Sequence, residues 1–198
     1  ISWRYNLKVD NLGVIVPFYN EKNTLAESIE RLLTQNIFSE IILSDDNSND
    51  GSDIIAKHYQ DKNENIKYIK SSTNKGKGNA LNNAKDYITT KFVVIHDADL
   101  EYFPEDLVEM FEKAKLNPQS LIIGSRFIGN KERVNIYRRT FIANKAMSLF
   151  FSFVHFCKIS DIATCYKMLK TDTFKEIQLY ENGFSIEIEL VSKFLKKN

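Results

Sequence analysis

Two carboxylates, Asp97 and Asp99, stand two residues apart directly after the apolar run at residues 92–95. Carboxylate oxygens are the ligands that hard divalent cations prefer, and Mg²⁺ usually combines one or two of them with water and phosphate oxygens. If the apolar run is a buried strand, both side chains lie just beyond its carboxyl end. We therefore predict a site for Mg²⁺ or Mn²⁺ that can hold a diphosphate, with Glu101 as a candidate third ligand.

Short apolar runs alternate with helical patterns along the chain, which is typical of a parallel sheet covered by helices on both faces. The predicted strands are residues 12–16, 41–44, 66–69, 92–95 and 121–123. The predicted helices are residues 25–34, 52–59, 78–87 and 104–115. We therefore expect an α/β fold with a mostly parallel sheet.

Polar side chains follow four of these strands, at the point where each strand ends. They are Tyr19 and Glu21, Asp45 and Asp46, Asp97 and Asp99, and Ser125 and Arg126. Ligands of such sheets bind beyond the carboxyl ends of the strands, so we expect these side chains to converge on one site. Asp50 and Ser52 are assigned instead to a turn and the start of the next helix.

The composition limits the classes of function. A chain of 198 residues with a net charge of +1 suits one domain and gives no support to a nucleic-acid partner. Cys157 and Cys165 cannot form a disulfide framework, which favours reduced thiols in a cytosolic setting. The sequence contains no signal peptide and no apolar run of about 18 residues. Because it begins at Ile1, we expect a fragment of a longer protein, whose other parts could carry a membrane anchor.

Four segments resemble, in their order and approximate spacing, the motifs of family 2 glycosyltransferases. The segments are residues 14–21, 45–52, 74–82 and 97–99. The resemblance implies the GT-A fold, a Rossmann-like, mostly parallel sheet flanked by helices, in a single domain over residues 1–198. It also implies a half that binds the nucleotide sugar, up to about residue 125, and an acceptor half over residues 126–198.

In that family the first two motifs hold the nucleoside of a sugar nucleotide, and residues 97–99 bind the metal. The donor contacts that the resemblance implies are Pro17, Tyr19, Glu21, Asp45, Asp46, Lys75, Gly76, Asp97 and Ala98. Carboxylates suit the N–H groups of a base and the hydroxyls of ribose. Alternatively, the side chains of Asp45 and Asp46 only stabilise a turn and a helix start by hydrogen-bonding to the nearby backbone. The resemblance implies that residues 74–78 close over the bound nucleotide. Alternatively, these residues are only a flexible basic loop.

Three further segments, residues 124–127, 137–139 and 161–167, resemble motifs of the polyprenyl-phosphate branch of this family. A guanidinium pairs well with a phosphate, so Arg126 and Arg139 are expected to position the acceptor. The acceptor-binding residues that the resemblance implies are Arg126, Arg138, Arg139, Lys167 and Glu187, with Phe184 beside them. Asp161 is implied to orient or deprotonate the acceptor, so Asp99, Asp161 and Arg126 are the expected catalytic residues. An alternative role for Glu187 is to stabilise the start of a helix.

Residues 141–156 are apolar nearly all round the predicted helix, which leaves two interpretations open. One is a buried core helix. The other is a helix that lies on a membrane surface and guides a lipid tail. The flanking charges of Arg138, Arg139, Lys145 and Lys158 suit an anionic surface.

The resemblance as a whole implies an inverting, metal-dependent transfer of a sugar from a donor of the GDP-mannose or UDP-glucose type. The expected acceptor is a polyprenyl phosphate, and the expected location is the cytoplasmic face of a membrane. One alternative acceptor is a hydroxyl of a cell-surface glycan, with Asp161 as the general base. A lesser alternative is a sugar-nucleotide-binding module without activity.

Overall fold

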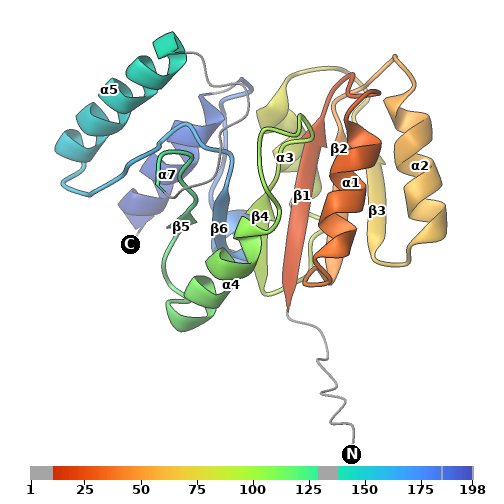
Figure 1. The fold of residues 1–198 in the computed structure, drawn as a ribbon, viewed down its shortest axis with the longest axis horizontal. Coiled ribbons are helices and arrows are strands. Elements are labelled where there is room, and N and C mark those ends of the chain that lie inside the picture. Colours follow the sequence, from red (N-terminus) through yellow and green to blue (C-terminus); the bar gives the residue numbers. More distant parts are fainter. Residues whose placement is uncertain (1–10, 129–137, 184, 198) are drawn as a thin grey trace, which may run out of the picture.

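The computed structural model describes residues 11–128, 138–183 and 185–197, and these form one six-stranded sheet with helices on both faces (Figure 1). The strands are β1 (Leu12–Phe18), β2 (Glu40–Asp45), β3 (Ile66–Lys70), β4 (Phe92–Ile95), β5 (Ile122–Ile123) and β6 (Lys167–Lys170). Their order across the sheet is β3-β2-β1-β4-β6-β5. The first four strands are parallel, so their carboxyl ends meet at the same edge. The predicted α/β class is confirmed.

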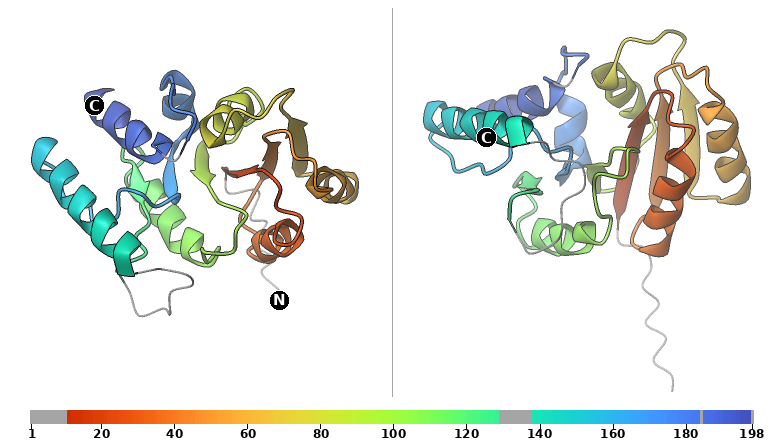
Figure 2. Two further views of the ribbon diagram at one scale, coloured as in Figure 1. Left: turned by 90° about the horizontal axis from the view of Figure 1, so that it is seen from above. Right: turned by 45° about the horizontal axis from the view of Figure 1, so that its top comes forward.

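Helices cover the two faces of the sheet in two groups. Within the described ranges the helices are α1 (Leu25–Thr34), α2 (Ser52–Lys62), α3 (Lys77–Ala84), α4 (Asp106–Leu116), α5 (Arg138–Val154), α6 (Thr171–Glu176) and α7 (Ile186–Lys197). α1, α2 and α4 pack on one face, and α3, α6 and α7 pack on the other (Figure 2). α5 lies beyond the β5 edge beside α7, where Phe151 and Val191 belong to one apolar cluster.

The central strand β1 is buried along its whole length because both faces of the sheet are covered. Val14 and Val16 join the core under α1, α2 and α4, whereas Ile15 joins the core under α3, α6 and α7. This alternation follows from the two-residue period of a strand. All five predicted strands and all four predicted helices are present, with ends that differ by a few residues.

The strand β6 is absent from the sequence prediction. It runs antiparallel between β4 and β5. Its apolar centre is only Met168 and Leu169, flanked by Lys167 and Lys170, and so short a run gives no strand pattern. Lys167 is nevertheless fully buried, which requires a buried partner for its charge.

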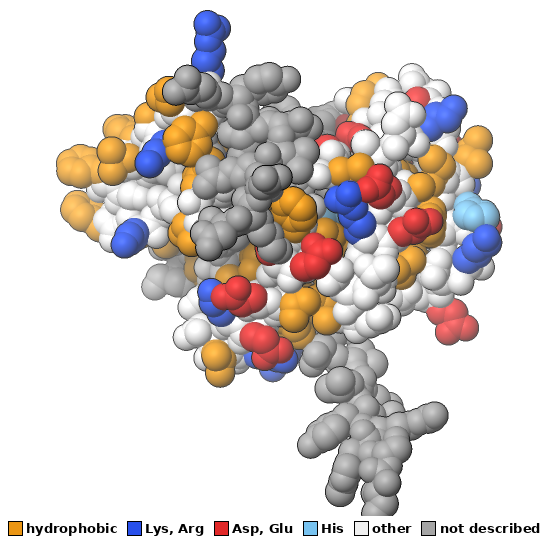
Figure 3. Space-filling view, in the orientation of Figure 1, with side chains coloured by type: hydrophobic (Ala, Val, Ile, Leu, Met, Phe, Trp, Pro, Cys, Tyr) orange, Lys and Arg blue, Asp and Glu red, His pale blue; other side chains and the backbone are white. Residues whose placement is uncertain are grey.

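The helix α5 turns two polar side chains and Phe151 inward and most of its other apolar side chains outward. Asn144 and Ser148 are buried, whereas Leu149, Phe150 and Phe153 are 73%, 69% and 77% exposed. Figure 3 shows hydrophobic side chains gathered over this part of the molecule. α5 is therefore not the buried core helix that one interpretation predicted. No helix among the described residues is long and apolar enough to cross a membrane.

The start of α3 lies against the segment just before α7, and Gly78 permits this contact. The N–H of Gly78 donates to the carbonyl of Asn182 at 3.1 Å, and a Cβ on Gly78 would collide with the carbonyl oxygen of Glu181. We expect Gly78→Ala to force the two segments apart and to lower the free energy of unfolding by about 1–3 kcal/mol, measured by denaturant unfolding. Gly183→Ala is the matched control, because nothing lies within 4 Å of a Cβ there. Equal losses in the two variants would contradict this packing.

Candidate functional site

A cavity of about 400 Å³ lies at the carboxyl edge of the sheet, beyond β1, β2 and β4. This is where ligands of parallel sheets bind. Predicted site residues that line it are Pro17, Tyr19, Glu21, Asp46, Gly76, Asp97, Ala98 and Asp99. Lys77, Ala80 and Asn182 also line it and were not predicted as contacts. Side chains from distant parts of the sequence therefore share one cavity, and most of the predicted donor contacts are among them.

Asp46 holds the loop before α3, at residues 74–76, in place at this cavity. Its carboxylate accepts hydrogen bonds from the backbone N–H groups of Lys75 at 2.9 Å and Gly76 at 2.5 Å, and from the side chain of Asn79 at 2.9 Å. Gly76 has a φ of +98°, and a Cβ there would collide with the carbonyl of Asn182, so only glycine suits the position. The side chain of Lys75 is exposed and does not line the cavity, so its donor contact stays a prediction.

Asp45, although adjacent to Asp46, does not line the cavity. Its carboxylate is fully buried and accepts hydrogen bonds from the N–H of Ser48 at 2.7 Å and the hydroxyl of Tyr68 at 2.8 Å. Burial, and then the Asp45 carboxylate, raise the pKa of Tyr68 well above its usual value. The structure thus gives Asp45 the turn-forming role that was its alternative, and its donor contact stays a prediction.

Asp97 and Asp99 bring two negative charges to one wall of the cavity. The protein around the Asp99 carboxyl group partly desolvates it, and together with the neighbouring Asp97 this raises the pKa of Asp99 to about 6. A cation placed between the two groups would relieve this repulsion. Two carboxylates, completed by water and phosphate oxygens, suit Mg²⁺ or Mn²⁺. The residues present therefore fit a divalent cation.

Glu101 does not join this pair as the expected third ligand. No group of three or more Asp, Glu, His or Cys side chains converges on a metal position in the part of the chain that the structure describes. The backbone N–H of Glu101 donates to Asp99 at 3.1 Å, and the Glu101 carboxylate is near enough to help raise the pKa of Asp99. The chain reverses at Leu100, between the two acidic residues, with a φ of +64°.

Lys77, the first residue of α3, places a positive charge beside the acids. Its ammonium lies 2.6 Å from a carboxylate oxygen of Asp97 and 2.6 Å from one of Glu187. Burial alone would lower the pKa of Lys77, but the two carboxylates outweigh burial and raise this pKa above its usual value. Sequence reasoning noted this lysine only as part of a basic loop.

Glu187 and Lys167 lie too deep to contact an acceptor directly. The Lys167 ammonium donates to Glu187 at 2.5 Å and to the carbonyls of Ile162 and Thr164. Burial raises the pKa of Glu187, but Lys167 and Lys77 outweigh burial and lower it, so the carboxylate is charged. In this structure Lys167 and Glu187 form an internal ion pair rather than offering free charges to an acceptor.

Arg126 is held by a fully buried carboxylate. The Nε of Arg126 donates to Asp161 at 2.9 Å and its Nη2 at 3.0 Å, while the Asn144 side chain donates to Asp161 at 2.6 Å. Burial would raise the pKa of Asp161, but these hydrogen bonds outweigh burial and lower it. An ionised carboxylate without exposed surface is a poor general base, so this arrangement does not favour the expected role of Asp161 as a base. Arg126 keeps 20% of its side chain exposed.

The remaining predicted acceptor residues are only partly described. Arg139 is exposed in the first turn of α5. Arg138 begins α5, but its side chain lies outside the described residues, as do Tyr137 and Phe184.

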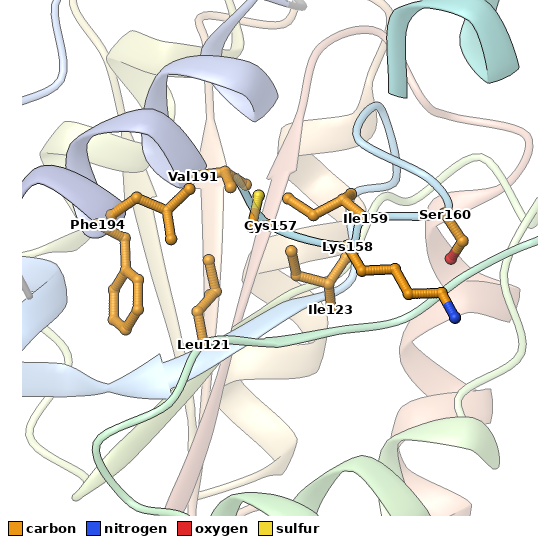
Figure 4. Close-up of a pocket in the computed structure, with 9 residues that line it drawn as sticks. Leu121, Ile123, Cys157, Lys158, Ile159, Ser160, Val191 and Phe194 are labelled. Atoms are coloured by element: carbon orange, nitrogen blue, oxygen red, sulfur yellow. The ribbon is translucent and has the colours of Figure 1, made fainter. Parts of the chain in front are cut away.

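A second pocket, of about 280 Å³, lies near the β5 edge of the sheet. Figure 4 shows Leu121, Val191 and Phe194 around it, with the Lys158 side chain extending away from them. Its lining carries no carboxylate. This pocket therefore lacks the groups that would hold a metal and a nucleotide.

Comparison with known proteins extends these observations. The family model for glycosyl transferase family 2 matches residues 13–178. The chain is 25% identical over 189 residues to glycosyltransferase AglJ of Haloferax volcanii, covering 95% of this chain and 59% of that protein. It is 27% identical over 186 residues to dolichol-phosphate mannosyltransferase of Pyrococcus furiosus, covering 92% of this chain and 52% of that protein. The chain thus spans little more than half the length of these relatives.

A solved structure shares the fold. Glucosyl-3-phosphoglycerate synthase of Mycobacterium tuberculosis, in complex with Mn²⁺, UDP and glucosyl-3-phosphoglycerate, has a TM-score of 0.72 with this chain. The match covers 94% of this chain and 65% of that one at 17% identity, and it confirms the predicted GT-A architecture. Both the family match and the resemblance of the strand-end motifs lead to the same assignment: the chain belongs to glycosyl transferase family 2.

Proposed function

We propose that this chain transfers a sugar from a nucleoside diphosphate sugar to a polyprenyl phosphate, with a divalent cation at the donor site. The observation that carries the proposal is the single cavity that joins Asp97 and Asp99 to Glu21 and Asp46. Acids suited to a nucleoside and acids suited to a metal therefore share one space. The relatedness to family 2 supports the same conclusion.

The donor is proposed to bind with its nucleoside near Glu21 and Asp46 and its diphosphate near Asp97 and Asp99. A divalent cation, when bound, supplies a Lewis acid that stabilises the charge on the departing diphosphate. The Mycobacterium tuberculosis enzyme of the same fold was solved with Mn²⁺ and UDP, which supports this type of ligand. Asp46 both holds the loop over the cavity and lines it, so donor binding and loop position depend on one carboxylate.

The acceptor is proposed to be a phosphate because the acceptor half, within residues 126–128, 138–183 and 185–197, offers a fixed guanidinium, and its expected base, Asp161, has no exposed surface. Asp161 and Asn144 hold Arg126 in place, and part of its side chain stays exposed. A phosphate is already ionised and needs positive charge for binding. A glycan hydroxyl would need a base, and Asp161 is buried and fully hydrogen-bonded. The relative named dolichol-phosphate mannosyltransferase supports a lipid phosphate.

The proposed reaction is a direct displacement at the anomeric carbon. A phosphate oxygen of the acceptor forms the new bond as the bond to the diphosphate breaks, which inverts the configuration. In this proposal Arg126 orients the acceptor, and the acids of the cavity hold the donor. The contribution of these residues is mostly positioning and charge stabilisation.

The outward face of α5 is proposed to contact the cytoplasmic face of a membrane. Leu149, Phe150 and Phe153 are largely exposed there, and Phe156 just beyond the helix is 95% exposed. Lys145 and Lys158 are exposed nearby and suit anionic lipids. A patch of this kind is unusual on a surface that contacts only water. It suits a lipid-linked acceptor better than a glycan in solution.

Label transfer tests the proposed function. The purified chain is given a panel of labelled UDP- and GDP-sugars with undecaprenyl phosphate, in Mn²⁺, Mg²⁺ or EDTA, and the products are extracted into organic solvent. Metal-dependent label in the organic phase is expected. Label that moves only onto a glycan acceptor would contradict the lipid phosphate, and donor binding without any transfer or hydrolysis would favour the inactive module.

Removal of one metal-binding carboxylate should abolish most of the transfer. We expect Asp99→Asn to lower kcat/KM by about 100-fold or more, because the charge that develops on the diphosphate loses its stabilisation. The measurement is initial-rate transfer at saturating Mn²⁺. Glu109→Gln, which breaks an exposed ion pair with Lys113 on α4, should leave the rate unchanged. Near-normal turnover of Asp99→Asn would contradict the proposed metal site.

The apolar face of α5 should govern binding to lipid. We expect Phe150→Ser together with Phe153→Ser to weaken binding to anionic vesicles by about tenfold or more, because each buried aromatic side chain contributes roughly 1.5–3 kcal/mol. Vesicle sedimentation measures the change. Leu116→Ser, at an 80% exposed position on α4, is the matched control and should have no effect. Equal binding by all three proteins would argue against this surface.

A further inference from the structure

Four side chains of alternating charge form a continuous chain through the protein. Asp97 contacts Lys77 at 2.6 Å, Lys77 contacts Glu187 at 2.6 Å, and Glu187 contacts Lys167 at 2.5 Å. The side chains become more buried along this chain, from 22% exposed at Asp97 to fully buried at Lys167. The chain therefore links the end of β4 to α7 and β6.

The position of the Lys77 ammonium conflicts with the proposed use of Asp97. A divalent cation and an ammonium that share one carboxylate repel each other in this poorly solvated space. Lys77 and Asp97 line the same cavity, so the two cations compete within the site itself.

The ammonium has a second partner that can retain it. Glu187 is buried and bound on its other side by Lys167, so its carboxylate is fixed in place. Asp97, by contrast, keeps a part of its side chain exposed to the cavity. The lysine stem is flexible enough to leave one carboxylate while it stays with the other.

We propose that Lys77 makes metal binding at Asp97 conditional on the nucleotide, an inference that rests on the proposed donor site. In the empty enzyme the ammonium occupies Asp97 and competes with a free cation. A cation that arrives with the diphosphate is accompanied by additional oxygen ligands, and this complex displaces the ammonium toward Glu187. Glu187 is a positioning residue for Lys77, and Lys167 fixes Glu187.

Titration of Mn²⁺, followed by electron paramagnetic resonance of the free ion, tests this inference without any need for turnover. We expect Lys77→Met to bind Mn²⁺ about tenfold more tightly than the wild type when no nucleotide is present. The further gain in Mn²⁺ affinity on adding UDP or GDP should shrink in this variant, because in the wild type the diphosphate attracts the ammonium and lowers the cost of moving it off Asp97. A purely structural role would instead weaken Mn²⁺ binding in both conditions.

Matched variants make the outcome decisive. Lys77→Gln is neutral and can still donate to Glu187, so it should show the same gain even if Lys77→Met is unstable. Lys77→Arg keeps the charge and should behave like the wild type, as should Lys113→Met on the surface of α4. Unchanged or weaker nucleotide-free binding in both neutral variants would overturn the inference while leaving the donor site intact. Failure of the wild type to bind Mn²⁺ even with UDP and GDP would overturn both.

Discussion

A fully buried lysine in an inner strand is the constraint on which the two sides of the site depend. Lys167 lies in β6, between β4 and β5, and an unpaired charge there would be costly. Glu187 neutralises it from the first turn of α7, which fixes the start of that helix against the sheet. Glu187 in turn holds Lys77, and Lys77 contacts Asp97. The charge at the edge of the donor cavity is thus set by a residue in the sheet interior.

On the proposed acceptor side, a second ion pair, between Asp161 and Arg126, has the corresponding role. Asp161 is fully buried and receives hydrogen bonds from both Arg126 and Asn144. Asn144 comes from α5, so this helix must turn polar side chains toward the protein. Phe151 packs inward against Val191, while Leu149, Phe150 and Phe153 stay outside and form the proposed lipid-binding face. The buried carboxylate of Asp161 thus both holds Arg126 and helps to fix which face of α5 points outward.

The strands and site residues that follow from a local sequence pattern could be predicted. Covered strands are apolar runs, so β1 and β4 could be placed, and the acids that follow them mark the site edge. The choice between Asp45 and Asp46 could not be made, because adjacent side chains point to opposite sides and the direction depends on the last residue of β2. Lys75 and Lys77 could not be distinguished either, because it was not evident that Lys75 lies in the loop while Lys77 begins α3. The burial of Asp161 could not be foreseen either, because its partners come from α5 and from the segment after β5.

The central claim is that the cavity binds a nucleoside diphosphate together with a divalent cation. Calorimetric titration of the wild-type chain with UDP and with GDP, in Mn²⁺ and again in EDTA, tests this most directly. The account predicts that at least one nucleotide binds at least about tenfold more tightly in Mn²⁺, because the cation links its diphosphate to Asp97 and Asp99. Equal affinity in Mn²⁺ and EDTA, or no binding of either nucleotide, would contradict it.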